Sequence, residues 1–100
     1  MAASSSRDDI LRRLSDARAS LREEFEVASF ALFGSVARDE ARDDSDIDVL
    51  VTFRQPIGLV AFGALEQRLA DLLGGRVDLV EPDALHPALR DRILREALER

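Results

Sequence analysis

Two aspartates separated by one residue form the most chemically suggestive feature of this 100-residue sequence. Asp46 and Asp48 lie near the start of a predicted strand, 46–53, so both carboxylates point to one face while Ile47 points to the other. At ~4 Å and an effective dielectric constant of 20, two like unit charges repel by about 4 kcal/mol. Either one acid stays protonated or a divalent cation neutralises the pair. Carboxylate oxygens suit Mg²⁺ or Mn²⁺, so the spacing predicts a metal site.

A third carboxylate, Asp78, lies in a short apolar strand predicted over 76–80, where a solvated surface acid is not expected. If this strand lies beside strand 46–53, Asp78 joins Asp46 and Asp48. Three carboxylates can hold two metal ions ~3.5–4 Å apart, the arrangement that serves in-line phosphoryl or nucleotidyl displacement. One ion would lower the pKa of the attacking hydroxyl, and the other would neutralise charge on a triphosphate. We therefore expect all three aspartates to be metal ligands and catalytic residues.

A Gly-Ser pair follows the buried strand predicted over 27–33. Gly34 lets the chain approach a phosphate closely, and the Ser35 hydroxyl and the first free amides of the following turn can bind triphosphate oxygens. Ten residues separate Ser35 from Asp46, enough for a helical turn and a return loop. Arg38, one turn further on, would face the same pocket and pair with a phosphate. These residues predict a nucleotide-binding loop.

The elements that must position these residues are predicted from hydrophobic periodicity. Apolar residues at helical spacing indicate long helices, whose leucine stripes we expect in the core, and short runs rich in β-formers indicate strands. The predicted helices are 7–24, 59–72 and 87–98, with a shorter one at 36–41, and the predicted strands are 27–33, 46–53 and 76–80. The order α-β-(α)-β-α-β-α predicts an α/β (α+β) fold, a small mixed sheet of three or so strands flanked by helices.

Length and composition predict one domain spanning residues 1–100. With 46% hydrophobic residues the chain can bury a core, yet no apolar run approaches the ~18 residues of a membrane span. Residues 1–9 contain no apolar segment typical of a secretory signal, so the cytoplasm is the expected compartment. The absence of cysteine excludes a disulfide scaffold, a zinc-thiolate site and a thiol nucleophile.

The charge balance excludes further classes of protein. Twenty acids against fourteen bases give a net charge of −6, which disfavours nucleic-acid binding. Every base is arginine, so the lysine of a Walker-type phosphate loop is missing. A lone histidine, His86, cannot supply the imidazoles of a zinc hydrolase and is predicted to cap the last helix.

Taken together, these residues show one spacing pattern: a Gly-Ser pair, ten intervening residues, an Asp-x-Asp pair and a later aspartate. In this chain the pattern consists of Gly34, Ser35, Asp46, Asp48 and Asp78. It resembles the signature of the DNA polymerase β-like nucleotidyltransferase superfamily. Segments 32–38 and 45–51 resemble its minimal nucleotidyltransferase (MNT) branch, and the resemblance covers nearly the whole chain. One departure is Asp39, where the family usually carries glycine.

The resemblance implies ATP as donor, AMP transfer as reaction and two Mg²⁺ ions as cofactors. Asp46 and Asp48 would bind both ions, and Asp78 would bind the catalytic ion and help activate the acceptor hydroxyl. MNT proteins are commonly antitoxins paired with HEPN-domain RNases, and the better understood members add AMP to a tyrosine of the toxin. By this resemblance the chain forms a hetero-oligomer with a HEPN toxin that supplies the tyrosine, because the chain itself has none. Neither direct nucleic-acid binding nor membrane binding is expected.

Each feature alone also has a simpler interpretation. Segment 43–46 could be a solvated acidic loop, the Gly-Ser pair an ordinary turn, and Asp78 a salt-bridged edge residue. Arg38 could pair with a neighbouring acid such as Asp39 or Asp43, or with the metal-site carboxylates. A calcium-binding EF-hand loop is excluded, because its required glycine and glutamate positions hold valine and glutamine here. Four features that agree in order and spacing favour the site over these alternatives.

Two alternatives to protein AMPylation stay open at the level of function. The chain could neutralise its toxin by occlusion alone, with a vestigial or regulatory nucleotide site. Transfer to a small molecule such as an aminoglycoside, or to an RNA end, is disfavoured because the chain has no room for a substrate domain and is acidic. The dense charges of 90–100 form either a solvated helix face or a partner-docking surface.

Overall fold

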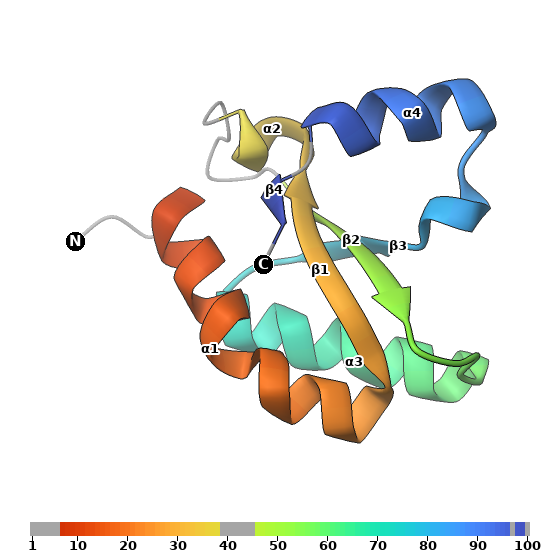
Figure 1. The fold of residues 1–100 in the computed structure, drawn as a ribbon. Coiled ribbons are helices and arrows are strands. Elements are labelled where there is room, and N and C mark those ends of the chain that lie inside the picture. Colours follow the sequence, from red (N-terminus) through yellow and green to blue (C-terminus); the bar gives the residue numbers. More distant parts are fainter. Residues whose placement is uncertain (1–6, 39–45, 97, 100) are drawn as a thin grey trace.

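Helices cover both faces of a four-stranded mixed sheet in the computed structural model, which describes residues 7–38, 46–96 and 98–99 (Figure 1). The elements in chain order are α1 (Arg7–Phe25), β1 (Val27–Phe33), α2 (Gly34–Ala37), β2 (Ile47–Phe53), α3 (Leu59–Leu73), β3 (Val77–Val80), the 3₁₀ turn η1 (Pro82–Ala84), α4 (Pro87–Glu96) and β4 (Leu98–Glu99). The predicted fold class and the order of its main elements are confirmed.

The strand order β3-β2-β1-β4 places the two aspartate-bearing strands side by side. Strand β2 runs antiparallel to β1 and parallel to β3, so the sheet is mixed as predicted. The register pairs Asp48 with Phe33 on one side and with Asp78 on the other. The end of β1 and the starts of β2 and β3 therefore meet at one end of the sheet.

The sheet separates two apolar clusters of unequal size. The main core fills the space between the sheet and helices α1 and α3. Its strand residues are Val27, Phe30, Leu32, Ile47, Val49, Val51 and Leu79. A smaller cluster on the opposite face joins Ala31 and Leu50 to Ile93 of α4. Burial of a Leu or Phe side chain stabilises a fold by about 1.5–3 kcal/mol. The larger cluster therefore contributes more to the stability of the fold, and α4 is held by fewer buried side chains.

The end of the last helix was predicted wrongly. The pattern predicted a helix continuing to Leu98, but α4 ends at Glu96 and Leu98–Glu99 form β4. Leu98 pairs with Leu32 and Glu99 with Ala31, so β4 covers the backbone donors and acceptors that β1 would otherwise expose as an edge strand. Ala97, placed by the pattern on the helix stripe, lies outside the described residues.

Some apolar residues assigned to the core by their spacing are exposed. Leu59 is 86% exposed and Leu89 is 47% exposed, although both continue a helical stripe. In α3 the burial begins one turn later, with Phe62 at the core edge and Leu65 fully enclosed, so the first turn projects beyond the core. Helix periodicity gives the direction of a side chain but not where along its axis the helix meets the sheet.

The remaining differences concern where elements begin and end. Helix α2 begins at Gly34, two residues earlier than predicted, and ends at Ala37 with Arg38 as its C-cap, while residues 39–41 of the predicted helix lie outside the described residues. Strands β2 and β3 each begin one residue later than predicted, so Asp46 precedes β2 and does not lie in it. His86 accepts a hydrogen bond at Nδ1 from the backbone N–H of Ala88 (3.3 Å), which confirms its predicted capping role for α4. In the part of the chain that the structure describes, no helix has the length and apolar character needed to cross a bilayer.

Candidate active site

The candidate site lies where β1 ends and where β2 and β3 begin. Gly34 directly follows the last residue of β1, while Asp48 and Asp78 are the second residues of β2 and β3. Because Asp48 pairs in register with Asp78, the two carboxylates come from one row across adjacent strands. Residues that are up to 44 positions apart in the sequence thus meet at one end of the sheet, as predicted.

Gly34 makes the closest backbone approach of the site. Its φ of +73° lies in the left-handed region, which L-residues with a Cβ rarely adopt. A Cβ at this position would collide with Oδ2 of Asp48 and lie 3.0 Å from its Cγ. The turn is closed by the backbone N–H of Arg38, which donates to the carbonyl of Gly34 (3.1 Å), and Ser35 is half-buried inside it. Glycine is therefore required both by the backbone angle and by the carboxylate against it.

The electrostatic environment of Asp48 reflects its neighbours. Partial burial raises the pKa of Asp48 above its ordinary value of 3.8, and repulsion by Asp78 and then Asp46 raises it further. The Arg38 guanidinium opposes these effects and lowers the pKa of Asp48. The charges of Asp78, Asp46 and Arg38 therefore all act on the carboxyl group of Asp48.

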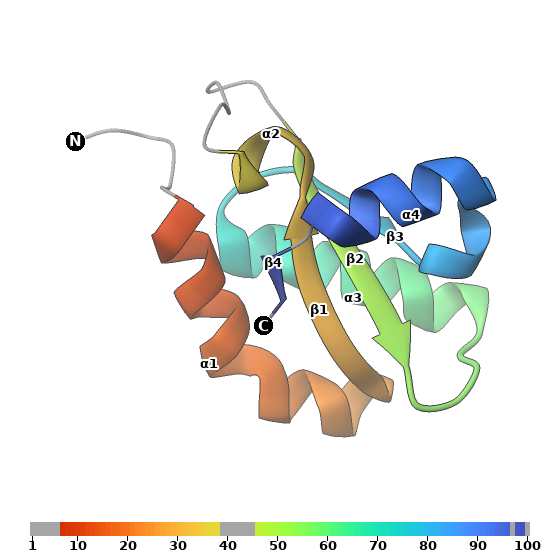
Figure 2. The same cartoon turned by 45° about the horizontal axis from the view of Figure 1, so that its top comes forward.

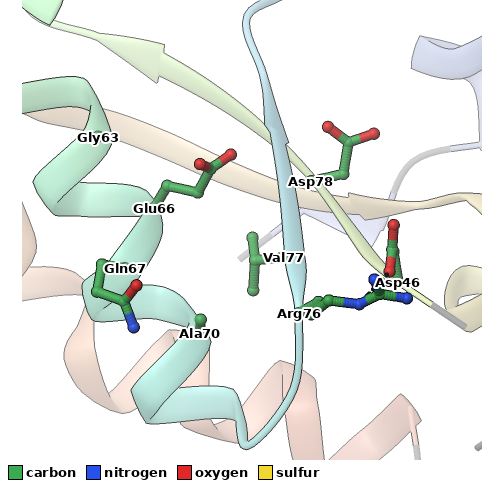
Figure 3. Close-up of a pocket in the computed structure, with 8 residues that line it drawn as sticks. All are labelled: Asp46, Gly63, Glu66, Gln67, Ala70, Arg76, Val77 and Asp78. Atoms are coloured by element: carbon green, nitrogen blue, oxygen red, sulfur yellow. Dashed lines mark ion pairs between the residues drawn. The ribbon is translucent and has the colours of Figure 1, made fainter. Parts of the chain in front are cut away.

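Asp46 has a cationic partner that the sequence pattern did not reveal. Its Oδ1 lies 3.1 Å from Nε of Arg76, the residue before β3, and both side chains are largely exposed (Figure 3). The carbonyl of Arg76 also accepts a hydrogen bond from the N–H of Ile47 (2.8 Å), which joins the starts of β2 and β3. Arg76 thus forms a surface ion pair with Asp46, and its backbone carbonyl helps fix the register of the two strands.

A cavity of about 460 Å³ opens beside the carboxylates, between α3 and β3. Asp46 and Asp78 line it from the strand side, and Glu66 and Gln67 line it from α3 (Figure 3). Figure 3 shows Glu66 pointing from α3 towards β3. Sequence reasoning missed both α3 residues, because polar side chains on the outer face of an amphipathic helix carry no signal of their own.

A second cavity, of about 200 Å³, lies on the other side of the Gly34 turn. Phe33, Gly34 and Arg38 line one wall, and α4 supplies the other with Leu89, Arg92 and Ile93. Arg38 therefore lines a cavity together with Gly34, whereas Ser35 and the three aspartates are not among the residues that line it. Arg92 was not predicted, since the charges of α4 alternate too regularly for one arginine to stand out.

Comparison with known proteins identifies the family. The family model of the nucleotidyltransferase domain matches residues 14–99. This chain belongs to that family. A curated relative of this nucleotidyltransferase, the protein adenylyltransferase MntA of Thermococcus cleftensis, is 45% identical over 78 residues, which cover 78% of this chain and 79% of the relative. The resemblance to MNT proteins is thereby confirmed.

Solved structures agree with the fold of this nucleotidyltransferase. One, provisionally described as a minimal nucleotidyltransferase, superposes with a TM-score of 0.79 at 41% identity, covering 94% of this chain and 95% of the other. A toxin–antitoxin structure with AMP-PNP contains a chain with a TM-score of 0.70 at 26% identity, covering 85% and 69%. A tri-AMPylated Shewanella oneidensis HEPN toxin in complex with MNT antitoxin contains the same fold, with a TM-score of 0.65 at 23% identity and coverage of 90% and 70%.

The donor set of this nucleotidyltransferase fits a hard divalent cation by its chemistry. Asp48 and Asp78 share one row of the sheet, Asp46 lies two residues before Asp48, and all are carboxylates. Repulsion between them leaves negative charge that a cation would offset. Across residues 7–38, 46–96 and 98–99, however, no three acidic or histidine side chains stand close enough to form a ligand set. The predicted set of three aspartates is therefore not closed in this structure: the backbone brings Asp46, Asp48 and Asp78 to one end of the sheet, but their side chains do not form a cluster.

The raised pKa of Asp48 makes the stability of the metal-free chain depend on pH. Folded Asp48 keeps its proton to a higher pH than unfolded Asp48, so its ionisation destabilises the fold at neutral pH, and this effect disappears as the pH falls through the folded pKa towards 3.8. We expect Asp48→Asn to increase the free energy of unfolding relative to wild type at neutral pH, and the difference to shrink on acidification. Urea unfolding in EDTA across a pH series measures it. Asp16→Asn makes the same substitution at an exposed carboxylate of α1 and serves as the control. A difference between wild type and Asp48→Asn that does not change with pH would contradict the account.

Proposed function

We propose that this nucleotidyltransferase transfers AMP from ATP to a hydroxyl group of a partner toxin of the HEPN class, with Mg²⁺ as cofactor and residues 1–100 forming one catalytic domain. The observation that carries the proposal is the register of Asp48 and Asp78 on adjacent strands, with the Gly34 turn directly against Asp48. This arrangement sets phosphate-binding groups beside a row of carboxylates. A site of this kind serves displacement at phosphorus.

Each site residue has a defined task in this proposal. Gly34 allows the triphosphate to approach the backbone closely, and Ser35 and Arg38 bind its oxygens through a hydroxyl and a guanidinium. Asp46, Asp48 and Asp78 would hold the Mg²⁺ ions. Arg76, which contacts Asp46 at 3.1 Å, would give up this contact when an ion binds. When bound, the ions supply charge neutralisation and lower the pKa of the attacking hydroxyl.

The proposed reaction is a single displacement at the α-phosphorus of ATP. The acceptor oxygen forms a bond to this phosphorus while the bond from phosphorus to the bridging oxygen of the β-phosphate breaks, and pyrophosphate leaves. The proton of the acceptor hydroxyl passes to Asp78, whose side chain is exposed on the edge strand β3. The products are pyrophosphate and an AMP group esterified to the acceptor.

The acceptor is assigned to a partner because the chain itself contains no tyrosine. The relative MntA is a protein adenylyltransferase, and a structural neighbour is a toxin–antitoxin structure with AMP-PNP, which supports both the donor and the kind of partner. The MNT resemblance supports the HEPN class of toxin, and a neighbour with this fold accompanies a tri-AMPylated HEPN toxin. We place the reaction in the cytoplasm, where ATP and Mg²⁺ are available.

Transfer of labelled nucleotide tests the proposal. The chain is incubated with Mg²⁺, with ATP labelled at the α-phosphate, and with the protein encoded beside it. We expect label on that partner protein and none on the chain. ATP labelled at the γ-phosphate should leave the partner unlabelled, because its label departs with pyrophosphate. Label from the γ-phosphate, or no label from either donor, would overturn the proposal.

A further inference from the structure

The cavity between α2 and α4 brings together two arginines from separate elements. Figures 1 and 2 both show the end of α4 beside α2 and the end of β1, and the cavity of about 200 Å³ lies between them. Arg38 comes from the end of α2 and Arg92 from α4. We infer that Arg92 is a second triphosphate-binding residue, which acts with Arg38 on the β- and γ-phosphates of ATP. The inference rests on the proposed function, since it assigns a role in binding the same donor.

Gly34 lies between the carboxylate of Asp48 and the cavity. One side of Gly34 faces the carboxylate of Asp48, and the same residue lines the cavity that contains Arg38 and Arg92. The cavity therefore borders, through Gly34, the end of the sheet that carries Asp48. A nucleotide whose α-phosphate lies beside Asp48 can extend its remaining phosphates past Gly34 into this cavity. There they meet two guanidinium groups.

The charge of the molecule limits which side chains can bind a triphosphate. The chain has a net charge of −6 and no lysine, so only arginine side chains can offset a polyanionic ligand. This cavity lies beside Gly34, and two separate segments of the chain each contribute a guanidinium group to it, Arg38 and Arg92. The planar guanidinium group of arginine can donate two parallel hydrogen bonds to two oxygens of one phosphate.

The packing of α4 on the sheet fixes the position of Arg92. Ile93, the neighbour of Arg92, is 9% exposed and packs with Ala31 and Leu50 on the sheet. This contact fixes the helix at the residue next to Arg92, whose own side chain is exposed and lines the cavity. The alternating charges of α4 therefore do not form a uniform solvated face. Arg92 is set apart by the cavity that it lines.

Calorimetric titration with AMP-PNP and with AMP, both with Mg²⁺, separates the contribution of the outer phosphates. We expect Arg92→Ala to weaken AMP-PNP binding about ten- to a hundredfold, the scale of a lost charge-assisted pair, while AMP binding is unchanged. Arg92→Lys keeps the charge without the fork and should weaken AMP-PNP binding several-fold. Arg95→Ala removes an exposed arginine from the same helix and should bind both nucleotides as wild type does.

The outcomes distinguish this inference from the proposed function. If wild type binds AMP-PNP and Arg92→Ala binds it equally well, the role of Arg92 is wrong and the proposed function stands. An equal loss for AMP-PNP and AMP would also overturn it, because Arg92 would then act through the fold. If Arg92→Ala melts at a lower temperature than wild type, the comparison of AMP-PNP binding with AMP binding is made with Arg92→Lys instead. A wild type that binds neither nucleotide overturns both the inference and the proposed function.

Discussion

Replacing Asp46 and Asp48 together by asparagine will reduce AMP transfer by at least about a thousandfold while the chain remains folded. Asparagine keeps the shape of each side chain but removes the charges that would hold Mg²⁺ and orient the α-phosphate. The fold should tolerate the change, because Asp48 is repelled by Asp78 and Asp46, and because the ion pair between Asp46 and Arg76 that is also lost lies at the surface. The initial rate of label transfer from ATP measures the activity, and thermal melting with EDTA measures the fold.

A matched control for this variant is Asp8→Asn/Asp16→Asn, which removes two exposed carboxylates from α1, away from the site. We expect this control to keep the wild-type transfer rate. Added Mg²⁺ should raise the melting temperature of wild type and of the control but not that of the site variant, because ligands that bind the folded state stabilise it. A site variant with more than about a tenth of the wild-type rate would contradict the assignment of these two aspartates.

Gly34→Ala is expected to reduce transfer about a hundredfold and to lower the free energy of unfolding by about 1–2 kcal/mol. The loss of stability follows from the φ of +73°, which a residue with a Cβ adopts at a cost. The loss of activity follows from the new Cβ, which would collide with Oδ2 of Asp48 and push the carboxylate from its place. Rates are measured well below the melting temperature, so that the two effects are separated.

Gly58→Ala is the control for this substitution. Gly58 precedes α3 with a φ of −73°, and a Cβ there would meet no atom within 4 Å. It should therefore leave the transfer rate unchanged and alter stability by only a few tenths of a kcal/mol up to about 1 kcal/mol, as expected for a capping position. If Gly34→Ala and Gly58→Ala gave equal rates, close contact between Gly34 and Asp48 would have no role in the reaction.

The local pattern of the sequence was sufficient to predict that Gly34, Asp48 and Asp78 lie close together at one end of the sheet. An i, i+2 pair in a strand necessarily shares a face, and Asp78 in an otherwise apolar strand required a polar neighbour. The parallel register of Asp48 and Asp78 meets the second condition. The first is met only in part, because β2 begins at Ile47 and Asp46 precedes the strand. The positive φ of Gly34 likewise agrees with a glycine placed between a strand and a helical turn. These features depend on residues that are close in sequence or on one strand pairing.

The features that the sequence did not predict depend on tertiary contacts. Arg76 and Arg92 are ordinary exposed arginines until the fold sets one beside Asp46 and the other beside Gly34. Strand β4 has only two residues, too few for any periodicity, and forms because β1 offers an open edge. Leu59 belongs to a helical stripe yet projects beyond the core. The departure at Asp39 lies outside the described residues.

The central claim, that the chain acts as a catalyst on its partner and not as a stoichiometric blocker, is tested most directly by the intact mass of the partner protein. A small molar fraction of the chain is mixed with the partner, ATP and Mg²⁺, and the mass and toxin activity of the partner are followed together. The account predicts that most of the partner gains one or more AMP groups and loses its activity while the chain is far below equimolar. Loss of activity only near equimolar amounts, with the mass of the partner unchanged, would contradict it and establish occlusion instead.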